Sequence, residues 1–113
     1  MLPKINRLKN TKDIERVFKN GKGFRGGSLF LKLVQNNLNT SRFAFIVSKK
    51  TVKKAARRNQ IKRRLRNIIK KEMPRIKIGL DMVVIVQKGA ESRDSKVIKE
   101  ETEAVLRKAN LFI

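Results

Sequence analysis

The stretch that decides the fold is AARRNQIKRRLRNIIKKEMPRIKIGLDMVVIV, residues 55–86. Its first part predicts a helix, because the apolar residues recur at helical spacing while charged or amide residues surround them. These apolar residues are Ile61, Leu65, Ile68 and Ile69. Pro74 ends this helix or closely follows its end. Asp81 then opens a continuous apolar run of strand length, residues 82–86, which favours a central strand covered on both faces.

Two stretches before this helix predict strands. Residues 29–34 and 43–48 alternate between two faces at the period of a β-strand. The polar residues 35–41 lie between them, so the two strands are expected to form a hairpin. The glycine-rich stretch from Gly23 to Gly27 predicts a turn-rich connector.

A further helix is predicted near each end of the chain. Asn10 or Thr11 can cap the first helix, and Gly21 ends it. The last helix begins at about Ser95 and has a separate apolar side, formed by Ile98, Val105, Ala109 and Phe112. The order helix, strand, strand, helix, strand, helix predicts an α+β fold with helices packed on a sheet, and it leaves the strand order open. A length of 113 residues predicts a single domain, residues 1–113.

The charge balance predicts a polyanionic partner. The chain has 30 Lys and Arg residues against 9 Asp and Glu, a net charge of +21. A surface charged only for solubility would mix both signs. Twelve basic residues and no acid lie between Lys49 and Lys71. A helix face that is merely solvated would interleave Glu with Lys at i,i+4, so nucleic acid is the expected partner.

Composition also restricts the chemistry. His, Cys and Tyr are absent, which excludes Ser-His and Cys-His nucleophiles and His-ligated metal sites. The nine acids lie mostly at helix starts or on solvent faces, so we predict no catalytic residue and no metal ligand. No stretch approaches the roughly 20 apolar residues that span a bilayer. With no cysteine to form disulfides, the chain is expected to be cytoplasmic and not bound to membranes.

One side of the basic helix is suited to phosphate. Asn59, Arg63, Arg66 and Lys70 lie at i, i+4, i+7 and i+11, which places them on one side. An Arg guanidinium can fork onto phosphate oxygens, and the free N–H groups at the helix start can also bind an anion. Arg58 falls near the apolar stripe, so we expect it to project from the first turn.

The segment from Ala55 to Arg66, preceded by Val47-Ser48-Lys49-Lys50, resembles the signature of the protein subunit of bacterial ribonuclease P. The resemblance extends to most of the chain: Leu8-Lys9, residues 17–21, residues 81–86 and the last helix. It implies a two-layer α/β sandwich with a roughly four-stranded sheet and three helices, in the order α-β-β-β-α-β-α. It also implies a left-handed crossover, against the general rule of handedness.

The resemblance further implies a function. In that family the catalyst is a large RNA that uses bound magnesium, held mainly by the RNA, to hydrolyse precursor tRNA at the 5′ end of the mature sequence. The implied partners are therefore the catalytic RNA and precursor tRNA, and no obligate protein partner is expected. A ribosomal or nucleoid structural protein would share the charge and size, but it would not need this motif spacing.

The resemblance implies two sets of binding residues. The contacts to the catalytic RNA would be Arg57, Arg58, Asn59, Lys62, Arg63 and Arg66. A cleft between the sheet and the N-terminal helix would hold the single-stranded 5′ leader, and its residues would be Phe18, Phe30, Lys32, Ser48, Lys49 and Lys50. A base can stack on Phe while Lys neutralises the adjacent phosphate. For Phe18 and Phe30, ordinary packing in the core explains the aromatic side chain equally well. The chain departs from the family pattern at Gln60, at Val52-Lys53-Lys54 and at Lys32, where an aromatic is often found.

Overall fold

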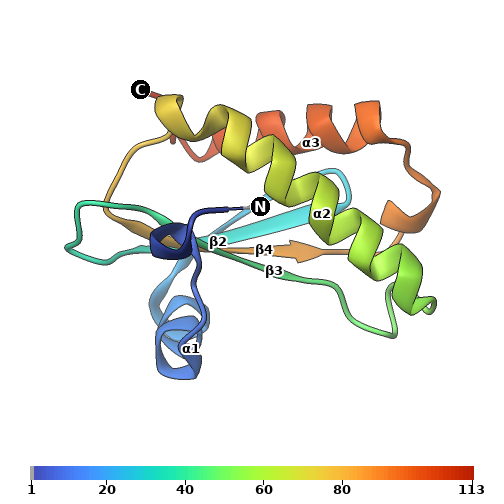
Figure 1. Ribbon diagram of the computed structural model, residues 1–113, viewed down its shortest axis with the longest axis horizontal. Coiled ribbons are helices and arrows are strands. Elements are labelled where there is room, and N and C mark those ends of the chain that lie inside the picture. The colour runs from blue at the N-terminus through green and yellow to red at the C-terminus, as the bar shows by residue number, and fades with distance from the viewer. Residues whose placement is uncertain (1) are drawn as a thin grey trace.

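The chain folds as a four-stranded sheet with two helices on one face and one helix on the other (Figure 1). The computed structural model describes residues 2–113. Its elements are α1 (Thr11–Asn20), β1 (Lys22–Gly26), β2 (Leu29–Gln35), β3 (Arg42–Ile46), α2 (Ala55–Glu72), β4 (Leu80–Val86) and α3 (Ser95–Lys108), with single 3₁₀ turns at Lys4–Asn6, Met73–Arg75 and Ala90–Ser92. The α+β class, with three helices and four strands, is therefore confirmed.

The predicted starts of the first and last helices are confirmed by their caps. The predicted extent of the last helix is wrong, because α3 ends at Lys108 and Ala109 and Phe112 lie beyond it, where Phe112 pairs with Ile76 in a β-bridge. The side chain of Asn10 accepts a hydrogen bond from the backbone N–H of Lys12 at the start of α1, and Gly21 ends that helix. Asp94 caps α3 in the same way, by accepting from the N–H of Val97. The apolar stripe of α2 faces the sheet, with Ile61, Leu65 and Ile69 fully buried.

The prediction that residues 82–86 form a central strand is also confirmed. β4 lies between β2, with which it is antiparallel, and β3, with which it is parallel. Met82 and Val84 pack in the core beneath α2 and α3. Val83, between them, points to the other face and packs with Val17 of α1. Both faces of β4 are therefore apolar because both are covered.

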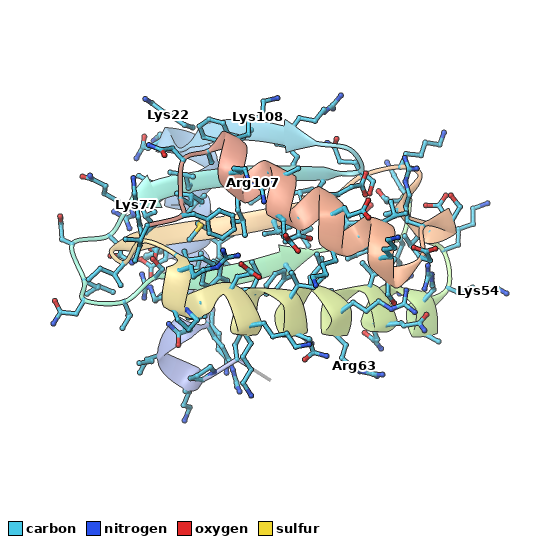
Figure 2. All side chains as sticks on the ribbon, turned by 90° about the horizontal axis from the view of Figure 1, so that it is seen from above. Lys22, Lys54, Arg63, Lys77, Arg107 and Lys108 are labelled. Carbon is cyan, nitrogen blue, oxygen red and sulfur yellow. The ribbon has the colours of Figure 1, made fainter. Side chains whose placement is uncertain are left out.

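The predicted hairpin between the second and third strands is wrong. The strand order is β1-β2-β4-β3, so β4 separates β2 from β3. The loop over residues 36–41 has to span two strand spacings, about 10 Å, which six residues do easily. Residues 82–86 of β4 are all apolar, and β4 lies in the interior of the sheet with a neighbouring strand on each side. The β3–α2–β4 crossover is left-handed (Figures 1 and 2), as the family resemblance implies.

Most of the stretch from Gly23 to Gly27, predicted to be a connector, instead belongs to strand β1, which pairs antiparallel with β2, and only Gly27 lies in the turn. Close approaches explain why glycine is needed there. A Cβ on Gly23 would lie 2.5 Å from the Phe30 ring, and a Cβ on Gly26 would lie 2.8 Å from Cβ of Val105 in α3. Two of the five residues of β1 therefore lack a side chain, which weakens the alternation by which a strand is predicted from sequence.

The two faces of the sheet are covered unequally. α2 and α3 lie together over one face and enclose the larger core (Figure 1). α1 packs against β2 and β4 on the other face, over the smaller cluster around Val17. Phe30, Ile46 and Ile85 on that face remain half-buried. The face that carries α1 therefore keeps an open area beside the helix.

Candidate nucleic-acid interface

The outward side of α2 is a basic surface that the protein itself does not neutralise. Asn59 and Arg63 are exposed, Lys62 and Arg66 are half-buried, and none of the four side chains makes a hydrogen bond within residues 2–113. No basic residue of the helix takes part in an ion pair of the described chain. Arg63 points away from the body of the molecule (Figure 2). We call these four residues the α2 face.

The other two predicted RNA contacts on α2 are engaged within the protein. Arg57 donates to the carbonyl oxygens of Glu91 and Arg93, which fixes α2 to the turn before α3. Arg58 projects from the first turn, as expected, but turns back and donates to two carbonyls of the loop that precedes the helix. Val52 anchors that loop in the core. Both arginines therefore support the α2 face, and their contact with RNA stays a prediction.

A cavity of about 530 Å³ lies at the start of α2. Its lining carries five cationic side chains and one acid: Lys50, Lys53, Lys54, Arg57, Lys88 and Glu91. No side chain caps the first N–H groups of the helix. The arrangement favours an anion, as the sequence predicts for this helix start. Lys50, which was assigned to the leader cleft, lies here beside Arg57.

Three of the predicted leader residues lie on the face of the sheet that carries α1. Lys32 of β2 reaches across to α1, where its Nζ donates to the carbonyl of Phe18 over 2.7 Å. The same ammonium lies 5.8 Å from the centroid of the Phe18 ring. Phe18 is 39% exposed, so part of its ring is open to solvent and is not enclosed in the core. The Phe30 ring lies against Gly23 on the same face.

A second cavity, of about 490 Å³, continues this face beyond the ends of the strands. Ser48 lines it, and the Ser48 hydroxyl accepts from the N–H of Thr51. Arg25 and Lys88 also line this cavity, and they were not predicted as site residues because they come from the ends of separate strands. The only local feature that could have indicated a binding role is the position of Lys88, shortly after an apolar strand and directly before Gly89. Lys49 is exposed and lines neither cavity.

Asp81 ties α1 to the sheet beneath this face. Its fully buried carboxylate accepts from Arg16 of α1 at 3.0 Å, from Nε and Nη2 of Arg42 at 2.8 and 2.7 Å, and from Asn36 at 2.9 Å. Burial alone would raise the pKa of Asp81, but the hydrogen bonds from Arg42, Asn36 and Arg16 hold that pKa below its usual value. The hydrogen bond to Asp81 and the charges of Asp81 and Asp13 raise the pKa of Arg42. The position of α1 over the sheet is therefore set by a buried charge cluster.

The acidic residues do not suit magnesium. Within residues 2–113 no three Asp or Glu side chains lie close enough to hold a metal ion, and Asp81 is already surrounded by donors. The side chains present therefore do not fit a magnesium site. No helix in the described part of the chain is long and apolar enough to cross a membrane.

Comparisons with known proteins agree on one family. The family model described as Ribonuclease P matches residues 2–110. The ribonuclease P protein component of Pseudanabaena sp. (strain PCC 6903) is 35% identical, over 99% of this chain and 97% of the relative. The Staphylococcus aureus RNase P protein superposes with a TM-score of 0.89 at 28% identity, over 96% of this chain and 98% of that one. The Thermotoga maritima RNase P protein gives 0.82 at 29% identity, over 90% and 96%.

Proposed function

This chain belongs to the ribonuclease P protein family, and we propose that it binds the catalytic RNA of that enzyme together with the 5′ leader of precursor tRNA. Membership makes the chain a component of a tRNA-processing endoribonuclease that also contains RNA. The observation that carries the proposal is the unpaired α2 face, whose cations have no protein partner among residues 2–113.

The catalytic RNA is assigned to the α2 face because that face offers phosphate contacts and little else. Arg63 and Arg66 can each fork onto phosphate oxygens, and Asn59 can bridge a phosphate or a ribose hydroxyl. Each contact releases condensed counterions, which favours binding. The bonds that Arg57 and Arg58 make to backbone carbonyls hold the start of the helix rigid before RNA arrives.

The leader is assigned to the sheet face beside α1. A single strand needs an aromatic platform and nearby positive charge, and Phe18 with Lys32 provides both within one contact. The exposed part of the Phe18 ring is available to a base. The strand could then continue toward Ser48, where the second cavity adds further cations.

Hydrolysis itself is assigned to the RNA. In this proposal the RNA would hold the magnesium, which would supply Lewis-acid chemistry there, and the protein would hold no metal. The protein positions the substrate and screens repulsion between the phosphates of the two RNAs.

The proposal is tested by reconstituting cleavage of precursor tRNA with the cognate RNA at low magnesium. Added protein is expected to stimulate cleavage. Arg63→Ala should weaken binding of the catalytic RNA and reduce the salt dependence of log K by about one unit, because one phosphate contact is lost. Lys22→Ala is the matched control, since Lys22 is exposed and lies on the opposite side of the molecule from Arg63 (Figure 2).

Absence of stimulation by the wild-type protein would overturn the proposal. Co-purification with ribosomal particles or bulk DNA, rather than with one large RNA, would favour a structural protein instead. An equal loss in Arg63→Ala and Lys22→Ala would show that net charge matters and the α2 face does not.

Leader binding is tested by Phe18→Ala. Loss of one stacked base is worth about 1–3 kcal/mol, so affinity for precursor tRNA should fall between about fivefold and about 150-fold while affinity for mature tRNA stays constant. Ile78→Ala is the control, because Ile78 is 67% exposed and lies in the loop before β4. Fluorescence anisotropy with both tRNAs gives the two affinities. An equal loss for both would make Phe18 a packing residue only.

A further inference from the structure

A third cavity, of about 400 Å³, opens at the outer edge of β3, between α1, α2 and the N-terminal segment. Apolar residues form most of its lining, among them Ile14 of α1 and Ala44, Phe45 and Ile46 of β3. Three cations, Arg7, Lys9 and Arg66, stand on its lining, and Arg7 donates from Nε to the carbonyl of Leu2. None of the residues assigned to the leader lines it, and Arg66 is the only one that it shares with the α2 face.

The edge of β3 beside this cavity is only partly covered. The N-terminal segment pairs with the strand at one bridge, between Arg7 and Phe43, where the N–H of Leu8 donates to the carbonyl of Phe43 over 2.9 Å. Alternate residues of a strand direct their backbone groups to the same side. Phe45 therefore turns its N–H and C=O to this edge as well, beyond the reach of the N-terminal segment. One backbone donor and one acceptor are left side by side next to the cavity.

The charge of the cavity is not balanced by the protein. No acidic side chain lines it. Lys9 and Arg66 make no ion pair within residues 2–113. An occupant should therefore combine a flat apolar part, a hydrogen-bonding edge and a negative charge.

We propose that this cavity binds one unstacked nucleotide of the partner RNA. The base would pack against Phe45 and pair with the backbone N–H and C=O of that residue, while Lys9 and Arg66 would bind the adjacent phosphates. Structured RNA offers such bases in loops and bulges. A volume of about 400 Å³ lies near the lower end of small-ligand sites, which suits one nucleotide and excludes a duplex. The inference rests on the proposed function and adds a subsite to it.

An extended peptide could also pair with the free edge of β3. The observations favour a nucleotide, because the N-terminal segment already occupies the start of that edge and leaves room for very few backbone bonds. The paired cations also match phosphate better than they match a neutral peptide.

The test is a titration of the full chain, isotopically labelled, followed by NMR of the backbone amides. The probes are adenosine and uridine 5′-monophosphate, with inorganic phosphate and tetraglutamate as comparisons. The nucleotides should shift the amides of Ala44, Phe45 and Ile46 in a saturable way. Phosphate alone should affect Lys9 and Arg66 and leave the Phe45 amide unchanged.

Two variants sharpen the test. Phe45→Leu keeps an apolar side chain but removes the aromatic face, so the nucleotide dissociation constant should rise about tenfold. Lys9→Ala should weaken binding several-fold through the lost phosphate contact. Lys12→Ala is the control, because Lys12 is an exposed lysine near Lys9 that does not line the cavity. Thermal melting of each variant confirms that it is folded.

The inference would be overturned by nucleotides and phosphate giving the same shifts, or by tetraglutamate shifting the Phe45 amide when nucleotides do not. It would also be overturned by equal affinities in Phe45→Leu and the wild type. Its failure is separate from failure of the proposed function, because the mononucleotide titration contains no ribonuclease P RNA. In the holoenzyme, one unpaired base should be protected from chemical modification by the wild type and exposed in Phe45→Leu.

Discussion

Replacing Asp81 by asparagine is expected to lower the free energy of unfolding by about 3 kcal/mol at neutral pH. Removing one partner of a buried ion pair typically costs about 3–5 kcal/mol, and the lower end applies because Arg16 and Arg42 keep some contact with water. The variant leaves two guanidinium groups facing a neutral amide. Urea denaturation at about pH 7 measures the difference.

The difference in unfolding free energy between the wild type and Asp81→Asn should depend on pH in one direction. The folded protein holds the pKa of Asp81 below its unfolded value. The contribution of Asp81 is therefore fully present above the unfolded pKa, and it is lost as the pH falls through the lowered folded value. The gap in stability between the wild type and Asp81→Asn should shrink as denaturation is repeated at increasingly acid pH.

Asp13→Asn is the matched control for this prediction. Asp13 also lies near Arg42, at 3.4 Å, but about a third of its side chain is exposed. Its pair with Arg42 should contribute less than about 1 kcal/mol. Equal losses in the two variants would show that burial of Asp81 has no special weight. A gap that persists unchanged in acid would mean that the carboxylate charge is not what stabilises the fold.

Raising monovalent salt from about 50 to 200 mM should weaken binding of the catalytic RNA about a thousandfold at constant magnesium. Each phosphate contact adds about 0.9 to the slope of log K against log salt, so about six contacts give a slope near −5. Filter binding across this range measures the slope. A slope near −1 would limit the contact to one or two phosphates and contradict the extended basic surface.

A triple variant shows where the salt dependence arises. Replacing Lys62, Arg63 and Arg66 together with alanine should reduce the slope by about three. The matched control replaces Lys22, Lys99 and Lys108, which are exposed lysines of β1 and α3. An equal change in slope for both triples would assign the effect to net charge alone.

The periodicity of apolar residues predicts those elements in which the pattern of side chains matches which faces are buried. The stripe of α2 and the two apolar faces of β4 are such cases, and so is the Asn10 cap. Periodicity failed for β1, because the Phe30 ring and α3 leave no room for side chains at positions 23 and 26. Phe30 belongs to β2 and Val105 to α3, so neither contact is visible in the sequence of β1 itself. Strand order is a property of the whole sheet, so the loop of residues 36–41 gave no sign that β4 enters beside it.

The candidate site was predictable in position and less so in detail. Spacing alone places Arg63 and Arg66 on the outward side of α2. It cannot show that Arg57 and Arg58 are held by backbone carbonyls, because these come from a turn near Glu91 and from the preceding loop. Arg25 and Lys88 line one cavity only because the sheet brings the ends of their strands together. The contact between Lys32 and Phe18 depends on the position of α1, which the contact of Arg16 with Asp81 fixes.

The place of β4 between two earlier strands has a consequence for synthesis of the chain. β1 and β2 can pair as soon as they leave the ribosome, but β3 has no neighbour in the sheet until residues 80–86 have been made. During that interval the edges of β2 and β3 that later pair with β4 expose unpaired backbone groups. Such open edges can pair with other copies of the chain. The same interval exposes the acid-free segment from Arg16 to Lys71, whose uniform positive charge makes nascent copies repel one another.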